Sequence, residues 1–86
     1  MSQYPRMAFI LISFPSGSRA FLDIVSVMSK FERYMMGSIQ VPDPRKQNSL
    51  FGILMRANTD QLGAFTGLLG KIKGVNVKSA VLPEDK

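Results

Sequence analysis

The chain has 86 residues, of which 45% are hydrophobic, and these numbers predict one small globular domain and exclude a disordered tail. It contains no cysteine and no histidine, which excludes disulfides, thiolate and imidazole metal ligands, and histidine-based acid–base catalysis. The formal net charge of +5 leaves a nucleic-acid partner open, although only Arg45 and Lys46 are adjacent cations.

The carboxylates give no sign of a catalytic pair. Glu84 and Asp85 lie in the polar tail, and the other four acids are spaced singly along the chain: Asp23, Glu32, Asp43 and Asp60. General acid–base catalysis needs such groups to be placed together. We therefore expect no catalytic residue, no metal and no cofactor, and a protein that is not an enzyme.

The longest apolar run, Met7 to Ile12, is far shorter than the roughly 20 residues that span a bilayer. Residues 1–6 lack the long apolar stretch and the small-residue cleavage site of a secretory leader. The expected location is therefore the cytoplasm, with no membrane contact.

Residues 7–14 form a nearly continuous apolar run between two prolines, which is typical of a buried strand. Ser18 then suits the start of an amphipathic helix. The apolar positions of this helix recur every three or four residues, at Phe21, Ile24, Val25 and Met28. The first third of the chain thus predicts a central strand followed by a helix.

Residues 34–41 mix apolar and polar side chains and stop at Pro42 and Pro44, which indicates an edge strand. A polar loop over 45–49 precedes a second continuous apolar strand over 50–55, ending near Arg56.

Thr59 is expected to cap a second helix that runs to about Lys73, where Gly74 ends it. Its apolar stripe is Leu62, Phe65, Leu69 and Ile72. Residues 75–82 alternate more clearly and predict a second edge strand. The chain therefore contains four expected strands and two expected helices.

This order of elements is the ferredoxin-like βαββαβ arrangement, in which the first and third strands are central in a four-stranded antiparallel sheet and both helices cover one face. The two most apolar strands occupy those central positions here. We predict an α+β fold and a single domain over residues 1–86.

Both faces of the predicted sheet are apolar. Because side chains alternate along a strand, the first strand presents Ala8, Ile10, Ile12 and Phe14 to one face and Met7, Phe9, Leu11 and Ser13 to the other. Two short helices can cover only one face, and the other would exceed the apolar patch usual for a monomer. We expect a second subunit or another apolar partner there; the alternative is that residues 42–47 shield it.

The second predicted helix contains Gly63, Gly67 and Gly70, spaced by four and three residues. They share a face that points roughly 150° away from the apolar stripe. Each interior glycine lowers helix stability by about 1 kcal/mol relative to alanine. Close approach of a partner backbone or a ligand explains the spacing, and neutral drift is the alternative.

Ser16, Gly17 and Ser18 join the first strand to the first helix, and their N–H groups are candidates for binding an anion. The alternative is a turn with a helix cap, because the loop has no phosphate-binding motif. Among other activities known on this topology, base stacking on the third strand would depend on Phe51 alone, and hydrolysis of acyl phosphates would depend on Arg19.

Residues 59–80 resemble the C-terminal half, and residues 34–42 the second strand, of the small ACT-like regulators of the iron-only hydrogenase system. The glycine-spaced helix that leads into residues 74–79 is the most specific part. The resemblance implies a ferredoxin-like ACT fold, oligomers built through the sheet and helices, a regulatory role, and kinship with the C-terminal domain of nickel-responsive repressors. Their nickel site is not implied, because its histidine and cysteine ligands are absent here.

The leading hypothesis is a cytoplasmic, non-catalytic ACT-like module that forms a dimer or tetramer. It is expected to bind a small-molecule effector or a protein partner at subunit interfaces near two groups of residues: Ser16, Gly17 and Ser18, and Gly63, Gly67 and Gly70. The alternative function is a basic nucleic-acid-binding domain of the same topology.

Overall fold

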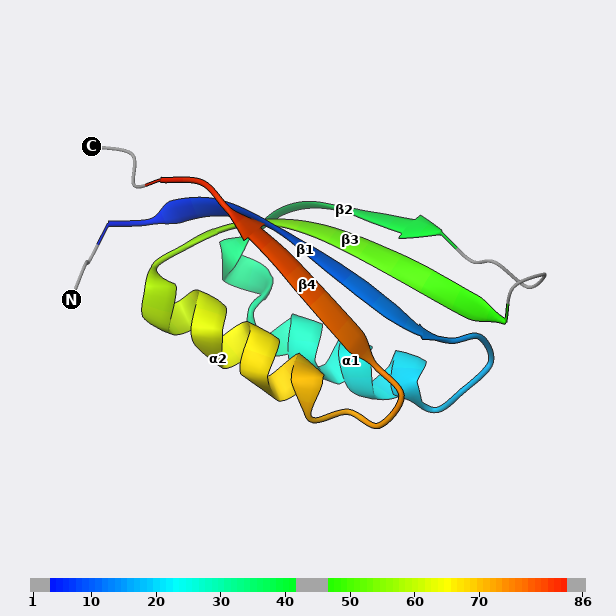
Figure 1. Cartoon of the computed structure of the whole chain (residues 1–86). Coiled ribbons are helices and arrows are strands. Elements are labelled where there is room, and N and C mark those ends of the chain that lie inside the picture. Colours follow the sequence, from blue (N-terminus) through cyan, green and yellow to red (C-terminus); the bar gives the residue numbers. More distant parts are fainter. Residues whose placement is uncertain (1–3, 42–46, 84–86) are drawn as a thin grey trace.

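The computed structural model describes residues 4–41 and 47–83, and its elements follow the predicted order. They are β1 (Arg6–Pro15), α1 (Ala20–Lys30), a short 3-10 helix (Glu32–Tyr34), β2 (Met35–Val41), β3 (Asn48–Ala57), α2 (Thr59–Gly70) and β4 (Asn76–Val81). The strands form one antiparallel sheet in the order β2-β3-β1-β4. Both helices lie on one face of it (Figure 1). The predicted βαββαβ fold is confirmed.

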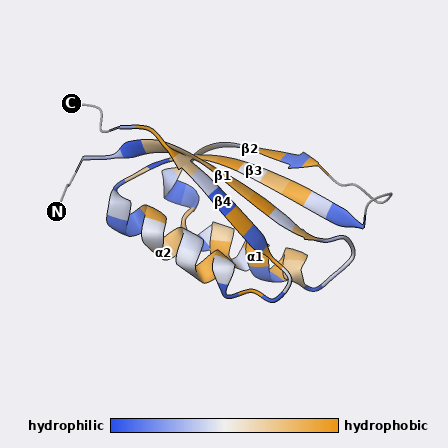
Figure 2. Cartoon of the chain, in the orientation of Figure 1, coloured by the Kyte–Doolittle hydropathy of each residue, from blue (hydrophilic) through white to orange (hydrophobic). Residues whose placement is uncertain are grey.

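The two apolar strands are central, as predicted. β1 pairs with β3 from Arg6 opposite Ala57 to Pro15 opposite Asn48, and on its other side it pairs with β4. β2 and β4 are the edges. Figure 2 shows that hydrophobic residues dominate the middle of β1 and β3.

The core lies between the sheet and the helices. It is formed by alternate residues of the two central strands and by one side of each helix: Ala8, Ile10, Ile12, Phe14, Phe51, Ile53, Met55, Ile24, Leu62, Phe65 and Leu69. Aromatic rings join the layers, because Phe14 and Phe21 both stack on Phe51, with ring centroids 5.4 and 5.8 Å away. The sequence did not determine which alternate residues of β1 face the helices. The structure shows that they are Ala8, Ile10, Ile12 and Phe14.

The start of α2 differs from the prediction by one residue. Asn58, not Thr59, is the cap: its Oδ1 accepts the N–H of Gln61 at 2.9 Å, and its own N–H donates to Gln61 Oε1 at 3.0 Å. This reciprocal capping box satisfies two N–H groups that the helix itself cannot satisfy. The helix ends at Gly70, three residues before the predicted end at Lys73, and Gly74 follows in a turn with φ +84°.

The buried side of α1 is also rotated from the predicted stripe. Ala20 and Ile24 are buried, whereas Phe21 and Val25 are 36% and 40% exposed. The small side chain of Ala20 fits beneath the sheet, while the longer Phe21 reaches sideways to the rings of the core.

β3 begins two residues before the predicted strand. Asn48 and Ser49 extend the pairing with the end of β1, so they are not part of a polar loop. Ser49 is buried there, and its hydroxyl hydrogen-bonds that of Ser16 at 2.8 Å. The side-chain bond explains why a polar residue is tolerated at the end of a buried strand.

Candidate functional site

The face of the sheet opposite the helices carries large apolar side chains that remain exposed. The strand register places them on one side, and their exposed fractions run from 37% to 61%: Phe9, Leu11, Ile39, Val41, Leu50, Leu54 and, just beyond β4, Leu82. We call this surface the open sheet face. Soluble monomers rarely leave a contiguous apolar patch of this kind in water.

A hollow of about 220 Å³ lies on the open sheet face between β1, β2 and β3. Its floor is Gly52, over which the ring of Phe9 lies so closely that a Cβ on Gly52 would be 2.7 Å from Phe9 Cζ. Ile39 and Leu54 also line it. A glycine in the middle of an apolar strand signals such a close approach, and Gly52 is the residue that carries this signal in the sequence.

Charge is sparse on the open sheet face. Lys78 lies opposite Leu11 and Arg56 opposite Met7, so these two cations share the face. No aspartate or glutamate belongs to any of the strands β1 to β4. The expected alternative cover, residues 42–47, lies largely outside the described residues.

The loop between β1 and α1 is a closed turn. The N–H of Ser16 donates to the carbonyl of Gln47 at 2.8 Å, and the N–H of Ser18 donates to the carbonyl of Pro15 at 3.3 Å. Ser18 Oγ accepts the N–H of Ala20 at 3.3 Å, and Gly17 has φ +73°. Two of the three N–H groups that were candidates for binding an anion therefore already donate to backbone carbonyls. The loop has the geometry of a turn that leads into α1.

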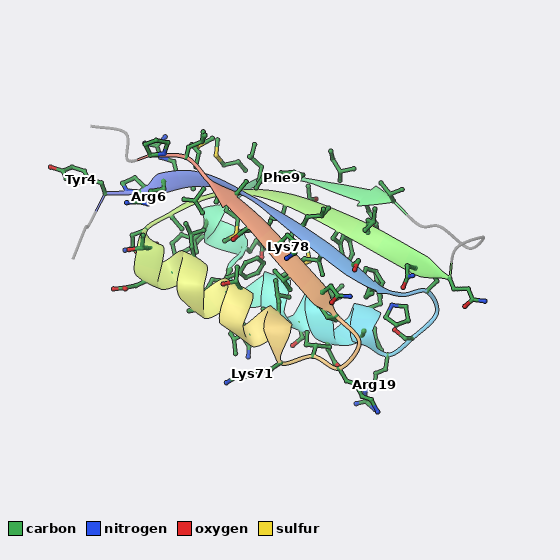
Figure 3. The ribbon with its side chains drawn as sticks, in the orientation of Figure 1. Tyr4, Arg6, Phe9, Arg19, Lys71 and Lys78 are labelled. Carbon is green, nitrogen blue, oxygen red and sulfur yellow. The ribbon has the colours of Figure 1, made fainter. Side chains whose placement is uncertain are left out.

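A hollow of about 440 Å³ lies beside this loop, where it faces the segment after α2. Charged residues from both sides line it, namely Arg19, Asp23 and Lys73, together with Ser18. Gly74 closes one side, because a Cβ there would lie 3.4 Å from the ring of Pro15. Figure 3 shows Arg19 extending outward from this end of the domain.

The glycines of α2 are exposed, as expected. A Cβ added at Gly63, Gly67 or Gly70 would meet nothing within 4 Å. Gly63 lines a separate hollow of about 240 Å³ between α2 and β4, next to Arg6.

The structure does not bring Gly63 to the serine loop. Arg6 and Pro15 are the two ends of β1, which are about 30 Å apart in an extended strand of this length. Gly63 lies near the Arg6 end and Ser18 near the Pro15 end. The six predicted binding residues therefore belong to different places on the surface, and their role in binding stays a prediction.

The prediction that Phe51 could stack on a base is wrong. Its ring is only 4% exposed and is held between Phe14 and Phe21 on the helix side of the sheet. Phe9 is the aromatic residue that the sheet exposes on its other face. The alternation of β3 turns Phe51 inward because it shares a side with Ile53 and Met55.

Within ranges 4–41 and 47–83, no three acidic side chains gather into a group that could hold a metal ion. No helix in the same ranges is long and apolar enough to cross a membrane.

Comparisons with known proteins agree on family and fold. Residues 6–79 match the model of a family described as TM1266-like, iron-only hydrogenase system regulator, which is a suggested role. A search of curated proteins found no match.

Among the solved structures that resemble the chain, the following three have identities of 12–22%, which establish the fold alone. The uncharacterized protein TM1266 from Thermotoga maritima has a TM-score of 0.88 at 22% identity, over 92% of this chain and 99% of that one. The ACT domain of the GTP pyrophosphokinase of Chlorobium tepidum has a TM-score of 0.74 at 22% identity, over 88% and 99%. SnoaB, a cofactor-independent oxygenase of Streptomyces nogalater, has 0.54 at 12% identity, over 94% of both chains.

Proposed function

Because the chain belongs to the TM1266-like family of iron-only hydrogenase system regulators and has an ACT-like fold, we propose that it is a non-catalytic regulatory module that works as an assembly of identical chains. The open sheet face carries this proposal. A second copy covers that face, and each chain of the assembly carries a site for an effector or a protein partner.

The shape of the open sheet face supports a second copy as the occupant. Two sheets that stack face to face lie about 10 Å apart and interleave their side chains. The hollow above Gly52 is of the size that a large apolar side chain fills, and Leu11 and Leu50 project from the same face beside it. In a twofold dimer each face supplies both the hollow and the side chain that enters it.

The distribution of charge favours this occupant over nucleic acid. A phosphate backbone is bound through several lysines and arginines, whereas the open sheet face carries Lys78 and Arg56 beside a broad apolar centre. A chain with a net charge of +5 still binds polyanions weakly at low salt. Filter binding at moderate salt separates this weak binding from specific binding.

Light scattering combined with size exclusion tests the assembly. We expect the wild-type chain to have at least twice its 9.5 kDa mass at micromolar concentration, and Leu54→Glu to shift it toward the monomer. Leu54 is exposed on the open sheet face, and the charge would have to be buried in a dimer. The matched control is Leu22→Glu, since Leu22 is exposed on α1, and it should keep the wild-type mass.

The hollow beside Ser18 is the proposed effector site. The hollow lies between the β1–α1 loop and the segment after α2. Its two cations, Arg19 and Lys73, outnumber the single carboxylate of Asp23, which suits a small molecule with an anionic group. A thermal-shift screen against amino acids, nucleotides and metal ions tests this, because a ligand of the folded state raises the melting temperature. We expect Arg19→Ala to abolish the shift that the best compound produces. An undiminished shift would place the ligand elsewhere.

A filter-binding assay with RNA and DNA tests the nucleic-acid alternative. Our proposal expects only weak, sequence-independent retention that disappears at moderate salt. Tight retention that survives moderate salt would favour the alternative function.

A further inference from the structure

The hollow of about 240 Å³ between α2 and β4 has no part in the proposed function. The first half of β1, the first two turns of α2 and the second half of β4 line it. We call it the α2–β4 hollow. It lies on the helix side of the sheet, because Ile10 and Leu62, which line it, belong to the core. A second copy on the open sheet face would therefore leave it accessible.

Two small residues, one from each element, keep the α2–β4 hollow open. The register sets Ser79 opposite Ile10, so the Ser79 side chain points to the helix side of the sheet, between Val77 and Val81. Across the hollow lies Gly63, where a Cβ would meet nothing within 4 Å. A large side chain at either position would fill the space between the helix and the edge strand.

Hydrogen-bonding groups from three elements meet in this hollow. Arg6 supplies a guanidinium group from the start of β1, while Thr59 of α2 and Ser79 of β4 supply hydroxyls. In the described part of the chain, neither hydroxyl has a hydrogen-bond partner. Figure 3 shows Arg6 at the same end of the sheet as the start of α2. A few convergent polar groups beside apolar side chains are typical of a small-molecule site.

The charge of the α2–β4 hollow selects the chemistry of its ligand. Arg6 is the one charged residue among the described residues that line it. A guanidinium group binds a carboxylate through two parallel hydrogen bonds. An amino acid would also bring an ammonium group, for which the described lining residues offer no carboxylate. The hollow therefore favours a carboxylic acid without an amino group.

The size of the hollow limits the rest of the ligand. Its 240 Å³ correspond to roughly eight water molecules, which is too little for a nucleotide. The apolar side chains of Leu62 and Val81 line it together with the hydroxyls. A ligand that fits has a short apolar chain and a group that can bond to a hydroxyl.

We propose that the α2–β4 hollow binds a small carboxylic acid that carries a hydroxyl group and a short apolar chain but no amino group. Arg6 binds the carboxylate, Thr59 and Ser79 bond to the hydroxyl group of the acid, and the apolar chain lies against Leu62 and Val81. The site is complete within one chain. It is separate from the proposed effector site, so this inference does not depend on the proposed function.

Titration with 2-hydroxyisovalerate tests the site, and valine is the matched compound because it has an amino group in place of the hydroxyl. Nuclear magnetic resonance spectra of the nitrogen-labelled chain supply the readout. We expect saturable shifts centred on the amides of Gly63 and Ser79, and a dissociation constant at least about tenfold lower for 2-hydroxyisovalerate than for valine. Sodium chloride at the same ionic strength should leave these amides unchanged.

Two substitutions should weaken the binding of 2-hydroxyisovalerate by at least about tenfold. Gly63→Leu fills the hollow, and its matched control is Gly67→Leu, because a Cβ at Gly67 also meets nothing within 4 Å but Gly67 does not line the hollow. Arg6→Gln removes the cation, and its matched control is Arg56→Gln on the open sheet face. Both controls should bind like the wild type, and circular dichroism checks that every variant is folded.

Four results would overturn this inference: no saturable shift at Gly63 and Ser79, equal affinity for valine, wild-type binding by Gly63→Leu, or shifts centred on Arg19 in the proposed effector site. The outcome is separate from that of the proposed function. If Leu54→Glu keeps the wild-type mass while the hollow binds the acid, the assembly fails and this site stands. If Leu54→Glu dissociates the protein while the hollow binds nothing, the assembly stands and this site fails.

Discussion

The two faces of the sheet are made from the same kinds of residue on the same strands, yet they differ in what covers them. Ile12 and Leu11 are neighbours in β1; the first is fully buried under the helices and the second is 41% exposed on the open sheet face. A small domain needs only one of these faces for its core. The second apolar face is therefore not needed for the core and is available for an interface, which is the basis of the proposed assembly.

The largest loss of stability is expected from a substitution in the core, on the face of the sheet that the helices cover. Phe65→Ala should lower the free energy of unfolding by about 3–5 kcal/mol, because it removes a fully buried ring from the core. In so small a domain this change is expected to leave much of the protein unfolded at room temperature. Urea denaturation followed by circular dichroism measures it. A loss below about 1 kcal/mol would mean that the helix-covered face is not the main core.

A substitution on the open sheet face should act on association instead. Leu11→Asp is expected to weaken dimerisation by about 2 kcal/mol or more, as for a residue near the centre of an interface. The unfolding of the diluted monomer should change by less than about 1 kcal/mol, because Leu11 is partly exposed to water there. Sedimentation equilibrium and dilute-solution urea melts separate the two quantities. If Leu11→Asp unfolds the monomer and leaves its association intact, the two faces do not differ as we describe.

A smaller loss of stability is expected at the start of α2. Asn58→Ala should cost about 1 kcal/mol, because it removes the side chain that accepts the N–H of Gln61. Thr59→Ala is the matched control and should cost less, since Thr59 is not the cap. Equal losses in the two variants, measured by urea denaturation, would contradict the assignment of the capping box.

The smallest change in stability is expected on the exposed side of α2, where the substitution should stabilise the chain instead of destabilising it. Gly67→Ala should stabilise the chain by about 0.5–1 kcal/mol, since alanine favours the helix and has open space there. Thermal unfolding of the diluted protein measures the gain. A loss of stability would show that the conformation at Gly67 requires glycine.

The sequence predicted the elements of this fold because the apolar patterns in it are strong. The continuous apolar runs around Ile10 and Ile53 identified the central strands, and the turn residues between segments marked where each element ends. Boundaries were less accurate where local polar contacts decide them. Asn58 takes the cap from Thr59 through a reciprocal bond with Gln61, a contact that spacing alone did not reveal.

The candidate surfaces were only partly predictable. Alternation showed that both sheet faces are apolar, but which face the helices cover depends on tertiary packing. Phe51 was a candidate for stacking because it is the one aromatic residue of the third strand, and the packing of the helices shows that it lies on the covered face. The separation of Gly63 from the serine loop likewise depends on the direction in which α2 crosses the sheet.

The most direct test of the central claim is a nuclear magnetic resonance experiment on a mixture of isotope-labelled and unlabelled chains. Isotope-filtered spectra detect only contacts between different copies. Our account predicts intermolecular signals from the methyl groups of Leu11 and Leu54 on the open sheet face. Their absence in a sample at millimolar concentration, with both leucines still accessible to a soluble relaxation agent, would contradict the claim that a second copy covers this face.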